Sequence, residues 1–150
     1  MTYERARALL SQITGVTVLD GGPPLTVVVP TEQFASVAVF VKETIGCGFF
    51  AFETVIDHKA DGLEVVLYVD NLNDKLSVIL RTKLGAGNTS CPSLAPVYRG
   101  ADWMERECYD MFGVRFEGHR DLRRILLADD WEGHPLLKSY AVDTPFPPYR

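Results

Sequence analysis

Side chains that could carry acid–base or metal chemistry are concentrated in residues 103–124, where acids and arginines alternate. The candidates for such chemistry in this segment are Glu105, Glu107, Asp110, His119 and Asp121. Acids and bases this close in sequence are expected to pair with each other or across an interface, where desolvated charge pairs fix register and partner choice. We therefore interpret them as ion-pairing groups. Acid–base chemistry with perturbed pKa values is the alternative.

Two histidines raise the question of a metal site. His119 and His134 are 15 residues apart and have acids near them. A strong zinc signal needs ligands at helical i, i+4 or CxxC spacing, and this pair has neither. We predict hydrogen-bonded structural histidines, with no metal ligands and no catalytic residues. The competing hypothesis is a free-standing metal-dependent hydrolase that uses His119, Asp121 and His134.

The three cysteines, Cys47, Cys91 and Cys108, are widely spaced and form no CxxC pair. This spacing lacks the ligands of a zinc ribbon or an iron–sulfur cluster, and it is typical of a chain in a reducing compartment. Cys108 falls on the apolar stripe of a predicted helix, which suits a small hydrophobic residue better than a reactive thiolate.

Composition argues against two broad classes of protein. The chain has 150 residues and a formal net charge of −5, whereas a general nucleic-acid binder needs an excess of Lys and Arg on one face. No segment reaches the roughly 18 consecutive apolar residues of a membrane span, and the N-terminus has no hydrophobic run of signal-peptide length. We expect one domain, no nucleic-acid partner and no direct membrane span.

A predicted helix that ends at Gly113 positions the charged segment. Asp102 is expected to cap the first turn of this helix, with Glu105 reaching back to it in a capping box. The buried stripe is formed by apolar side chains at helical spacing: Met104, Cys108, Met111 and Phe112. The opposite face carries Arg106 and Asp110, with Glu107 beside them.

Upstream, signals for helices and strands alternate. Helices are predicted from Thr2 to Gly15 and from Thr31 to Gly46, with the two threonines as N-caps. Strands are predicted at residues 16–18, 25–29, 49–58, 63–70 and 76–81. This order predicts an α+β fold: a small antiparallel or mixed sheet with helices packed on one face, a short charged signature helix and a long extended C-terminal tail.

The last three strands are predicted to form an antiparallel meander. Phe50, Phe52 and Ile56 share one side of the first of them, and Asp61-Gly62 marks the hairpin turn that follows. Residues 85–96 are rich in Gly, Ser, Thr, Asn and Pro and are predicted to be a loop.

The predicted organisation is a sheet domain at 1–92, a signature loop and helix at 93–113, and a tail at 114–150, all in one folding unit. The tail shows no helical or strand period, and its prolines prevent long regular elements. Yet it contains large apolar side chains such as Phe116 and Trp131, each of which forfeits roughly 1.5–3 kcal/mol when left in water. Two interpretations stay open: a tail ordered along a partner protein, or an irregular segment folded back on its own sheet.

The charged helix and the tail resemble the C-type subunit of respiratory NADH:quinone oxidoreductase (complex I). The resemblance covers roughly residues 93–145 and is carried by short motifs in a fixed order: Ser93-Leu94, Ala101-Asp102-Trp103, Glu105-Arg106-Glu107, Tyr109-Asp110-Met111-Phe112-Gly113, Phe116, Gly118-His119, Asp121-Leu122-Arg123-Arg124-Ile125-Leu126 and Asp130-Trp131-Glu132-Gly133-His134-Pro135-Leu136.

The resemblance implies a non-catalytic subunit of the peripheral arm, held at the cytoplasmic side of the membrane through the complex. In this family the subunit binds no cofactor of its own, and iron–sulfur clusters, flavin or a NiFe centre belong to partner subunits. It packs beside the large D-type subunit, which helps form the quinone cavity. The implied role is to support electron transfer from NADH through iron–sulfur clusters to quinone, coupled to ion translocation. The alternative is the equivalent subunit of a membrane-bound NiFe hydrogenase, a formate hydrogenlyase or a ferredoxin- or deazaflavin-linked dehydrogenase.

From the charged segment and the resemblance we predict a partner-docking surface with these members: Trp103, Glu105, Arg106, Glu107, Asp110, Phe116, His119, Asp121, Arg123, Arg124 and Trp131. Two positions depart from the family pattern. The family usually has proline after the residue that corresponds to His119, where this chain has Arg120, and it favours arginine where this chain has Leu137.

Overall fold

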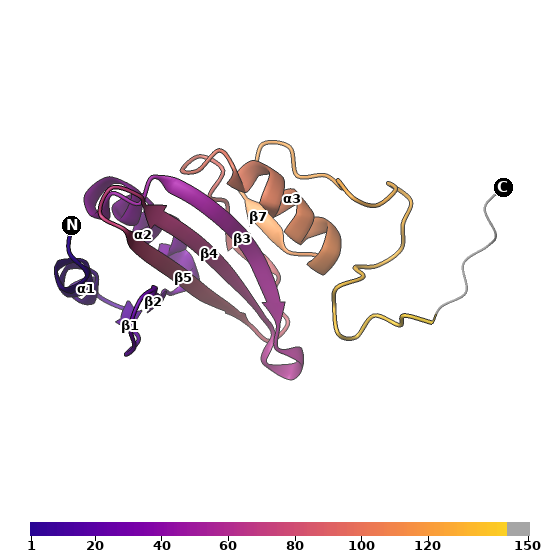
Figure 1. The fold of residues 1–150 in the computed structure, drawn as a ribbon. Helices are drawn as coiled ribbons and strands as arrows, with labels where there is room; N and C mark the ends of the chain where they lie inside the picture. The colour runs from indigo at the N-terminus through magenta and orange to yellow at the C-terminus, as the bar shows by residue number, and fades with distance from the viewer. Residues whose placement is uncertain (144–150) are drawn as a thin grey trace.

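A five-stranded sheet in the order β1-β2-β5-β4-β3 forms the centre of the computed structural model, which describes residues 1–143 (Figure 1). Its strands are β1 (Thr17–Val18), β2 (Leu25–Val28), β3 (Phe49–Asp57), β4 (Leu63–Asn71) and β5 (Leu76–Gly85). β2 pairs with β5 in parallel, and the other pairs of this sheet are antiparallel. The predicted meander and mixed sheet are therefore confirmed. The predicted tail residues Pro145, Phe146, Pro147 and Pro148 lie outside the described residues.

Helices cover one face of this sheet. They are α1 (Tyr3–Ser11), the short 3₁₀ turn η1 (Thr31–Gln33), α2 (Phe34–Phe40) with its π-helical extension η2 (Val41–Ile45), and α3 (Ala101–Phe112); a 3₁₀ turn, η3 (Lys59–Asp61), joins β3 to β4. Thr2 caps α1 as predicted, because its hydroxyl accepts a hydrogen bond from the Arg5 N–H at 3.3 Å. Gly46 and Gly113 end η2 and α3 in the left-handed conformation, also as predicted.

The core lies between the helices and alternate residues of the strands. Leu25 and Val27 of β2, Val65 and Leu67 of β4 and Leu80 of β5 are fully buried in one cluster. The same cluster contains Phe34 and Val41 from the second helical segment and Cys108 from α3. Because strand side chains alternate between faces, every second residue of these strands lies against the helical layer.

Two predicted helix caps are wrong. Thr31 lies inside η1 rather than before a helix, and its hydroxyl contacts that of Thr82 on β5 at 3.0 Å. Gly100, not Asp102, occupies the N-cap position of α3 and makes no side-chain cap. Glu105 does not close a capping box, since its carboxylate binds a loop located 11 and 12 residues upstream. In both cases a tertiary contact replaces the local hydrogen bond that the sequence pattern predicted.

Phe52 and Ile56, which were predicted to share one side of β3, lie on its exposed face. Phe52 and Ile56 are 39% and 37% exposed, whereas Glu53 and Val55, between them in sequence, are buried. A register shift between Phe50 and Phe52 separates the two phenylalanines. Phe52 stacks on Tyr68 of β4 at 5.4 Å between ring centroids, and Phe50 contacts the Tyr98 ring at 5.8 Å. The acid, not the aromatic residue, therefore enters the interior at this point of the strand.

A second, two-stranded sheet was missed by the sequence analysis. β6 (Ser90–Pro92) lies in the predicted loop, β7 (Arg115–Glu117) lies in the predicted tail, and the two pair in parallel. Cys91 and Phe116 face each other in register and are both buried. Beyond β7 the described residues 118–143 contain no further helix or strand. They run along α3 (Figure 1), and the Lys138 N–H reaches the end of β3 at Asp57.

The turn between β3 and β4 requires glycine at position 62. Its φ of 88° and ψ of −163° lie in a region that is essentially restricted to glycine. A Cβ there would also lie 2.3 Å from the Gly85 carbonyl oxygen.

We expect Gly62→Ala to lower the free energy of unfolding by at least about 1–3 kcal/mol, the usual cost of such backbone strain. The measurement is urea unfolding, with Gly48→Ala as the control, because no atom lies within 4 Å of a Cβ at position 48. Equal losses of unfolding free energy in the two variants would contradict the requirement for glycine at position 62.

Candidate functional site

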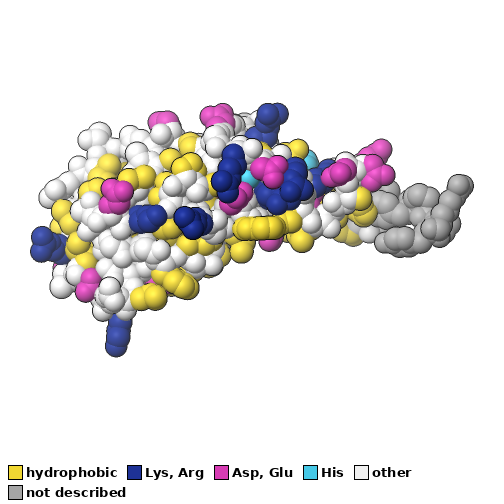
Figure 2. All heavy atoms as spheres, turned by 90° about the horizontal axis from the view of Figure 1, so that it is seen from above, with side chains coloured by type: hydrophobic (Ala, Val, Ile, Leu, Met, Phe, Trp, Pro, Cys, Tyr) yellow, Lys and Arg dark blue, Asp and Glu magenta, His cyan; other side chains and the backbone are white. Residues whose placement is uncertain are grey.

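The charged face of α3 is covered by the C-terminal tail. Figure 2 shows basic, acidic and histidine side chains gathered on the side of the molecule where α3 and the tail lie. Within this region, Glu105, Arg106 and Asp110 of α3 are 0%, 7% and 0% exposed. The burial of Arg106 and Asp110 accompanies their contacts with the tail that follows the helix, whereas Glu105 is buried against the loop that precedes the helix.

Asp110 binds the tail through its carboxylate. The backbone N–H groups of Ile125, Leu126 and Leu127 donate to one oxygen at 2.8–3.1 Å. The Arg124 guanidinium donates to the other oxygen at 2.6 Å. Burial on its own would raise the pKa of Asp110, but these donors outweigh burial and hold the pKa below its ordinary value.

Two arginines complete this clasp. Arg106 of α3 donates to the carbonyl oxygens of Arg123 and Arg124 at 3.2 and 3.1 Å, and its guanidinium lies 5.3 Å from the centre of the Trp103 ring. Arg124 also donates to the carbonyl oxygens of Trp131 and Gly133. We call Arg106, Asp110 and Arg124 the tail clasp. Because it grips mainly backbone groups, it fixes the path of the tail rather than a particular side chain.

Further contacts hold the tail at the C-terminal end of α3. His134 lies against Gly113, and its Nδ1 is 2.9 Å from the Asp110 carbonyl oxygen. The Leu136 N–H donates to the Met111 carbonyl at 3.0 Å. Leu137 is partly buried against the core, and the adjacent Lys138 N–H donates to Asp57 at 2.7 Å. At position 137, where the family favours arginine, leucine serves as an intramolecular apolar contact.

At the other end of α3, Glu105 and His119 join two loops to the helix. Glu105 accepts a hydrogen bond from the Ser93 hydroxyl at 2.6 Å and another from the Leu94 N–H. His119 has a fully buried side chain whose Nε2 lies 2.9 Å from an Asp102 carboxylate oxygen. Its Nδ1 accepts from the Asp121 N–H at 3.0 Å, so Nε2 carries the proton and donates toward Asp102. This geometry is that of a hydrogen-bonded structural histidine.

Glu53 is a buried acid that the sequence analysis missed. It is 2% exposed, and neither carboxylate oxygen has a hydrogen-bond partner. Burial, followed by the charge of Glu105, raises the pKa of Glu53 well above its ordinary value. Burial also raises the pKa of Glu105, but hydrogen bonds from Ser93 and Leu94 oppose that rise. The proton of this pair therefore resides on Glu53. The sequence did contain one indication of this burial: Glu53 lies two residues before Val55 in the predicted strand, so the two side chains share a face.

The residues proposed for metal chemistry are not brought together. His119 contacts the first turn of α3 and His134 the last, and Asp102 and Asp110 are about 12 Å apart at 1.5 Å per helical residue. Within residues 1–143, no group of three or more His, Cys, Asp or Glu side chains could hold a metal ion. The metal-dependent hydrolase hypothesis therefore lacks its proposed ligand set.

The cysteine side chains are buried and reduced. Cys47, Cys91 and Cys108 are free thiols in the core. Burial raises the pKa of Cys47 to about 12 and raises the pKa values of Cys91 and Cys108 as well. A thiol that stays protonated is a poor nucleophile. The prediction that Cys108 acts as a small hydrophobic residue agrees with this position.

The predicted docking residues divide into three groups by their exposure. The side chains of Glu105, Arg106, Asp110, Phe116 and His119 are buried inside the chain. Arg124 and Trp131 are partly buried, and Arg124 belongs to the clasp. The exposed members are Trp103, Glu107, Asp121 and Arg123. Asp121 and Arg123 pair with each other at 3.0 Å. Docking through these residues stays a prediction, but only the exposed group presents side chains on this surface.

Comparison with known proteins decides the family. Residues 27–145 match the family described as "Respiratory-chain NADH dehydrogenase, 30 Kd subunit". The chain belongs to this family. The match includes the charged helix, the clasp and the described tail, and it confirms the resemblance found in the sequence.

Curated relatives are named as the C-type subunit of NADH-quinone oxidoreductase. The relative from Sinorhizobium medicae is 39% identical over 123 residues, which cover 79% of this chain and 60% of the relative. The relative from Geobacter sulfurreducens is 36% identical over 128 residues, which cover 81% of this chain and 76% of the relative. This chain spans about three fifths of the length of the first of these relatives.

Solved structures share the fold. A trypsin-resistant fragment of Nqo5 aligns with a TM-score of 0.71 and 28% identity, over 81% of this chain and 100% of the fragment. A chain of the membrane-bound sulfane sulfur reductase, an archaeal respiratory membrane complex, aligns with a TM-score of 0.70 at 22% identity. The second likeness concerns the fold alone. Among the described residues, no helix has the length and apolar character needed to cross a membrane.

Proposed function

We propose that this chain is a non-catalytic subunit of a complex I-type NADH-quinone oxidoreductase. In this role it docks to the large quinone-site subunit, at the cytoplasmic side of the membrane, and supports electron transfer to quinone. The iron–sulfur clusters and flavin belong to partner subunits. Membership of the 30 Kd subunit family and the names of the curated relatives support the proposal.

The observation that carries the docking role is the orientation of the tail. The clasp satisfies the tail's backbone groups on α3, yet Leu126 and Leu136 remain 61% and 52% exposed. Covering a leucine of this kind is worth roughly 1.5–3 kcal/mol. Backbone polar groups of the segment are thus turned to its own helix while two of its leucines face outward, and exposed leucines of this kind are expected on a surface that another protein covers.

The clasp also gives this surface a fixed shape before docking. Asp110 and Arg106 hold consecutive backbone groups of residues 123–127. A segment that is already ordered loses less conformational entropy when it binds, so more of the burial free energy contributes to affinity. Exposed Trp103, beside Arg106, extends the surface with a residue type that often anchors interfaces.

A related membrane-bound respiratory complex is the second candidate. The fold likeness to a chain of the sulfane sulfur reductase complex favours this candidate, because the same fold occurs in an assembly of another kind. Both candidates give the chain the same docking role and differ in the electron donor and acceptor. The identity of the subunits that co-purify with the chain distinguishes them.

We expect the double variant Leu126→Ser, Leu136→Ser to bind the other subunits at least roughly tenfold more weakly, because it removes two exposed apolar contacts. The measurement is co-purification of the tagged full chain from its host, together with thermal melting of the isolated chain. Leu72→Ser is the matched control, since Leu72 is 65% exposed in the turn between β4 and β5, away from the tail. Retention of the double variant at the wild-type level would contradict the docking role of the tail.

A further inference from the structure

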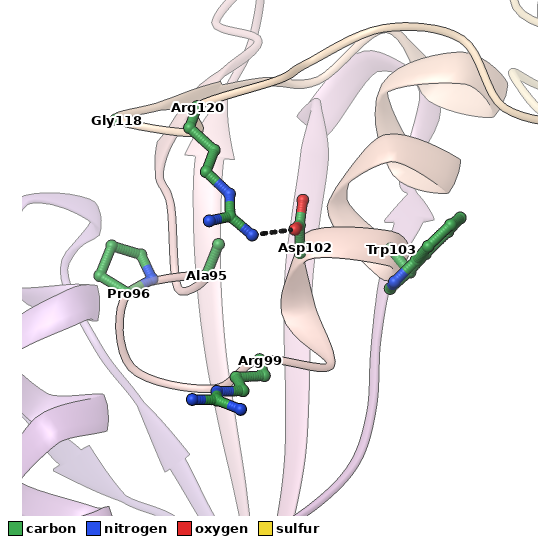
Figure 3. A pocket seen from close by; sticks show the side chains of 7 residues that line it. All are labelled: Ala95, Pro96, Arg99, Asp102, Trp103, Gly118 and Arg120. Carbon is green, nitrogen blue, oxygen red and sulfur yellow. Dashed lines mark hydrogen bonds and ion pairs between the residues drawn. The ribbon is translucent and has the colours of Figure 1, made fainter.

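A cavity of about 610 Å³ lies beside the first turn of α3. Its wall is formed by residues from three segments that are apart in sequence: Ala95, Pro96 and Arg99 from the loop before α3, Asp102 and Trp103 from the helix, and Gly118 and Arg120 from the loop after β7. Figure 3 shows Arg99 and Arg120 on opposite loops that flank the space, with Asp102 on the helix between them. None of the three clasp residues lines this cavity, although Trp103, which does, lies beside Arg106 of the clasp.

The charges that line the cavity do not cancel. Asp102 is the single acid among its lining residues, and it already contacts Arg120 at 3.1 Å and His119 at 2.9 Å. Arg99 is exposed, and within the described chain no ion pair neutralises it. The cavity therefore presents one uncompensated positive charge on a chain whose formal net charge is −5.

Each of the two guanidinium groups that line the cavity can bind a carboxylate. An arginine presents its N–H donors in a planar fork that matches a carboxylate, and such charge-assisted pairs are stronger than neutral hydrogen bonds. The Arg120 side chain is 84% exposed, so it can bind a further acid without leaving the surface. Trp103 lines the same cavity and is 62% exposed, which adds an apolar wall. Tryptophan and arginine together are the residue types that dominate interface energetics.

We propose that this cavity receives an aspartate or glutamate side chain from an acidic segment of a neighbouring subunit, held between Arg99 and Arg120 with the flanking apolar part of that segment on Trp103. The proposal rests on the proposed function, since it assumes that the chain works inside a complex. It adds a second docking point at the N-terminal end of α3, separate from the apolar tail. It also assigns the exposed arginines a role in choosing the partner.

The first test is retention in the complex. The tagged full chain is expressed in its host with Arg99→Glu and Arg120→Glu, and with the neutral pair Arg99→Gln and Arg120→Gln. We expect the neutral variant to be retained roughly tenfold less than the wild type and the reversed variant still less. Arg5→Glu is the matched control, because Arg5 is an exposed arginine on α1, far from the cavity in sequence. Thermal melting of each isolated variant should match the wild type, since both guanidinium groups are at the surface.

The second test identifies the occupant. A photo-crosslinking phenylalanine analogue replaces Pro96, an exposed residue that lines the cavity, so that both arginines are kept. It is irradiated in the assembled complex, and the attached peptide is sequenced. A peptide of another subunit that contains Asp or Glu beside the crosslink supports the proposal; a peptide without an acid overturns it. Vesicles with phosphatidylglycerol, compared with phosphatidylcholine alone, provide a further arm. Binding to them that depends on Arg99 and Arg120 would assign the cavity to a lipid headgroup and overturn the proposal.

These outcomes distinguish a failure of the cavity proposal from a failure of the proposed function. If the wild-type chain co-purifies with other subunits and the arginine variants do so equally well, the cavity proposal fails and the proposed function stands. If the wild-type chain co-purifies with no respiratory subunit, the proposed function fails, and the cavity proposal fails with it.

Discussion

Replacing Glu53 by glutamine should stabilise the fold at pH values above the ordinary pKa of glutamate and have little effect near or below that pKa, at about pH 4. Glu53 is buried without a hydrogen-bond partner, and burial and Glu105 raise its pKa. Between the unfolded pKa and the raised folded pKa, the folded chain holds a proton that the unfolded chain has released. Stability therefore falls as the pH rises through this window. Glutamine cannot ionise, so the variant lacks this loss.

Glu64 provides the matched control, because it is an equally buried glutamate on the neighbouring strand. It is 1% exposed and binds Arg81 at 2.7 Å and His58 at 2.8 Å. Burial would raise its pKa, but Arg81 and then His58 outweigh burial and lower it. Its contribution to stability is present above the unfolded pKa and is lost as the pH falls through the folded one. Glu64→Gln should therefore destabilise the chain at neutral pH, by about 1–3 kcal/mol.

The two glutamates thus predict opposite signs in the same experiment. The measurement is the free energy of urea unfolding at a series of pH values for the wild type, Glu53→Gln and Glu64→Gln. The difference in the free energy of unfolding between Glu53→Gln and the wild type should increase as the pH rises. Parallel profiles for these two proteins would show that Glu53 is ionised or paired in the folded chain, contrary to its environment in the structure.

Removing the carboxylate of Asp110 should release the tail from α3. Asp110→Ala leaves three backbone N–H groups and one nitrogen of the Arg124 guanidinium without the acceptor that they share. Breaking a buried charge pair by deleting one partner usually costs about 3–5 kcal/mol. The loss should appear first as faster hydrogen exchange at the amides of residues 125–127, because they donate directly to Asp110.

Asp121→Ala serves as the comparison. Asp121 and Arg123 are 55% and 65% exposed in their pair, and such surface pairs contribute about 0–1 kcal/mol. This variant should leave exchange at residues 125–127 unchanged. Slow exchange at these amides in Asp110→Ala would show that other contacts fix the tail.

The sequence was sufficient for features that depend on local pattern. The alternation of β4 and β5, the turn at Gly62 and the helix ends at Gly46 and Gly113 each follow from a few neighbouring residues. The helix that carries the charged segment was predicted for the same reason. Membership of the family was also accessible, because the motif residues stand in a fixed order along the chain.

Features that depend on contacts between residues far apart in the chain could not be predicted from the sequence. Glu105 fits a capping box by spacing, but Ser93 lies 12 residues away and provides the better partner once the loop is folded. β6 and β7 have three residues each, which is too short for a visible period, and they pair across 25 residues of chain. On β3, aromatic residues favour the core by composition, yet the outer face takes Phe52 because Tyr68 stacks on it.

The tail illustrates why two interpretations could not be separated in the sequence. Its backbone contacts Asp110 and Arg106, which favours a segment folded back on its own chain. Its exposed Leu126 and Leu136 favour a segment covered by a partner. The first description holds for the backbone of these residues, and cover by a partner stays a proposal for their exposed side chains. Composition does not contain this distinction between backbone and side-chain atoms.

The most direct test of the account is purification of the tagged wild-type chain from membranes of its host in a mild detergent, followed by mass spectrometry and assay of NADH-dependent quinone reduction. The account predicts that the chain emerges with the large quinone-site subunit and the NADH-oxidising subunits, and that quinone reduction is found in this assembly. Recovery of the chain as a free monomer that carries its own redox group, or that turns over a substrate alone, would contradict it.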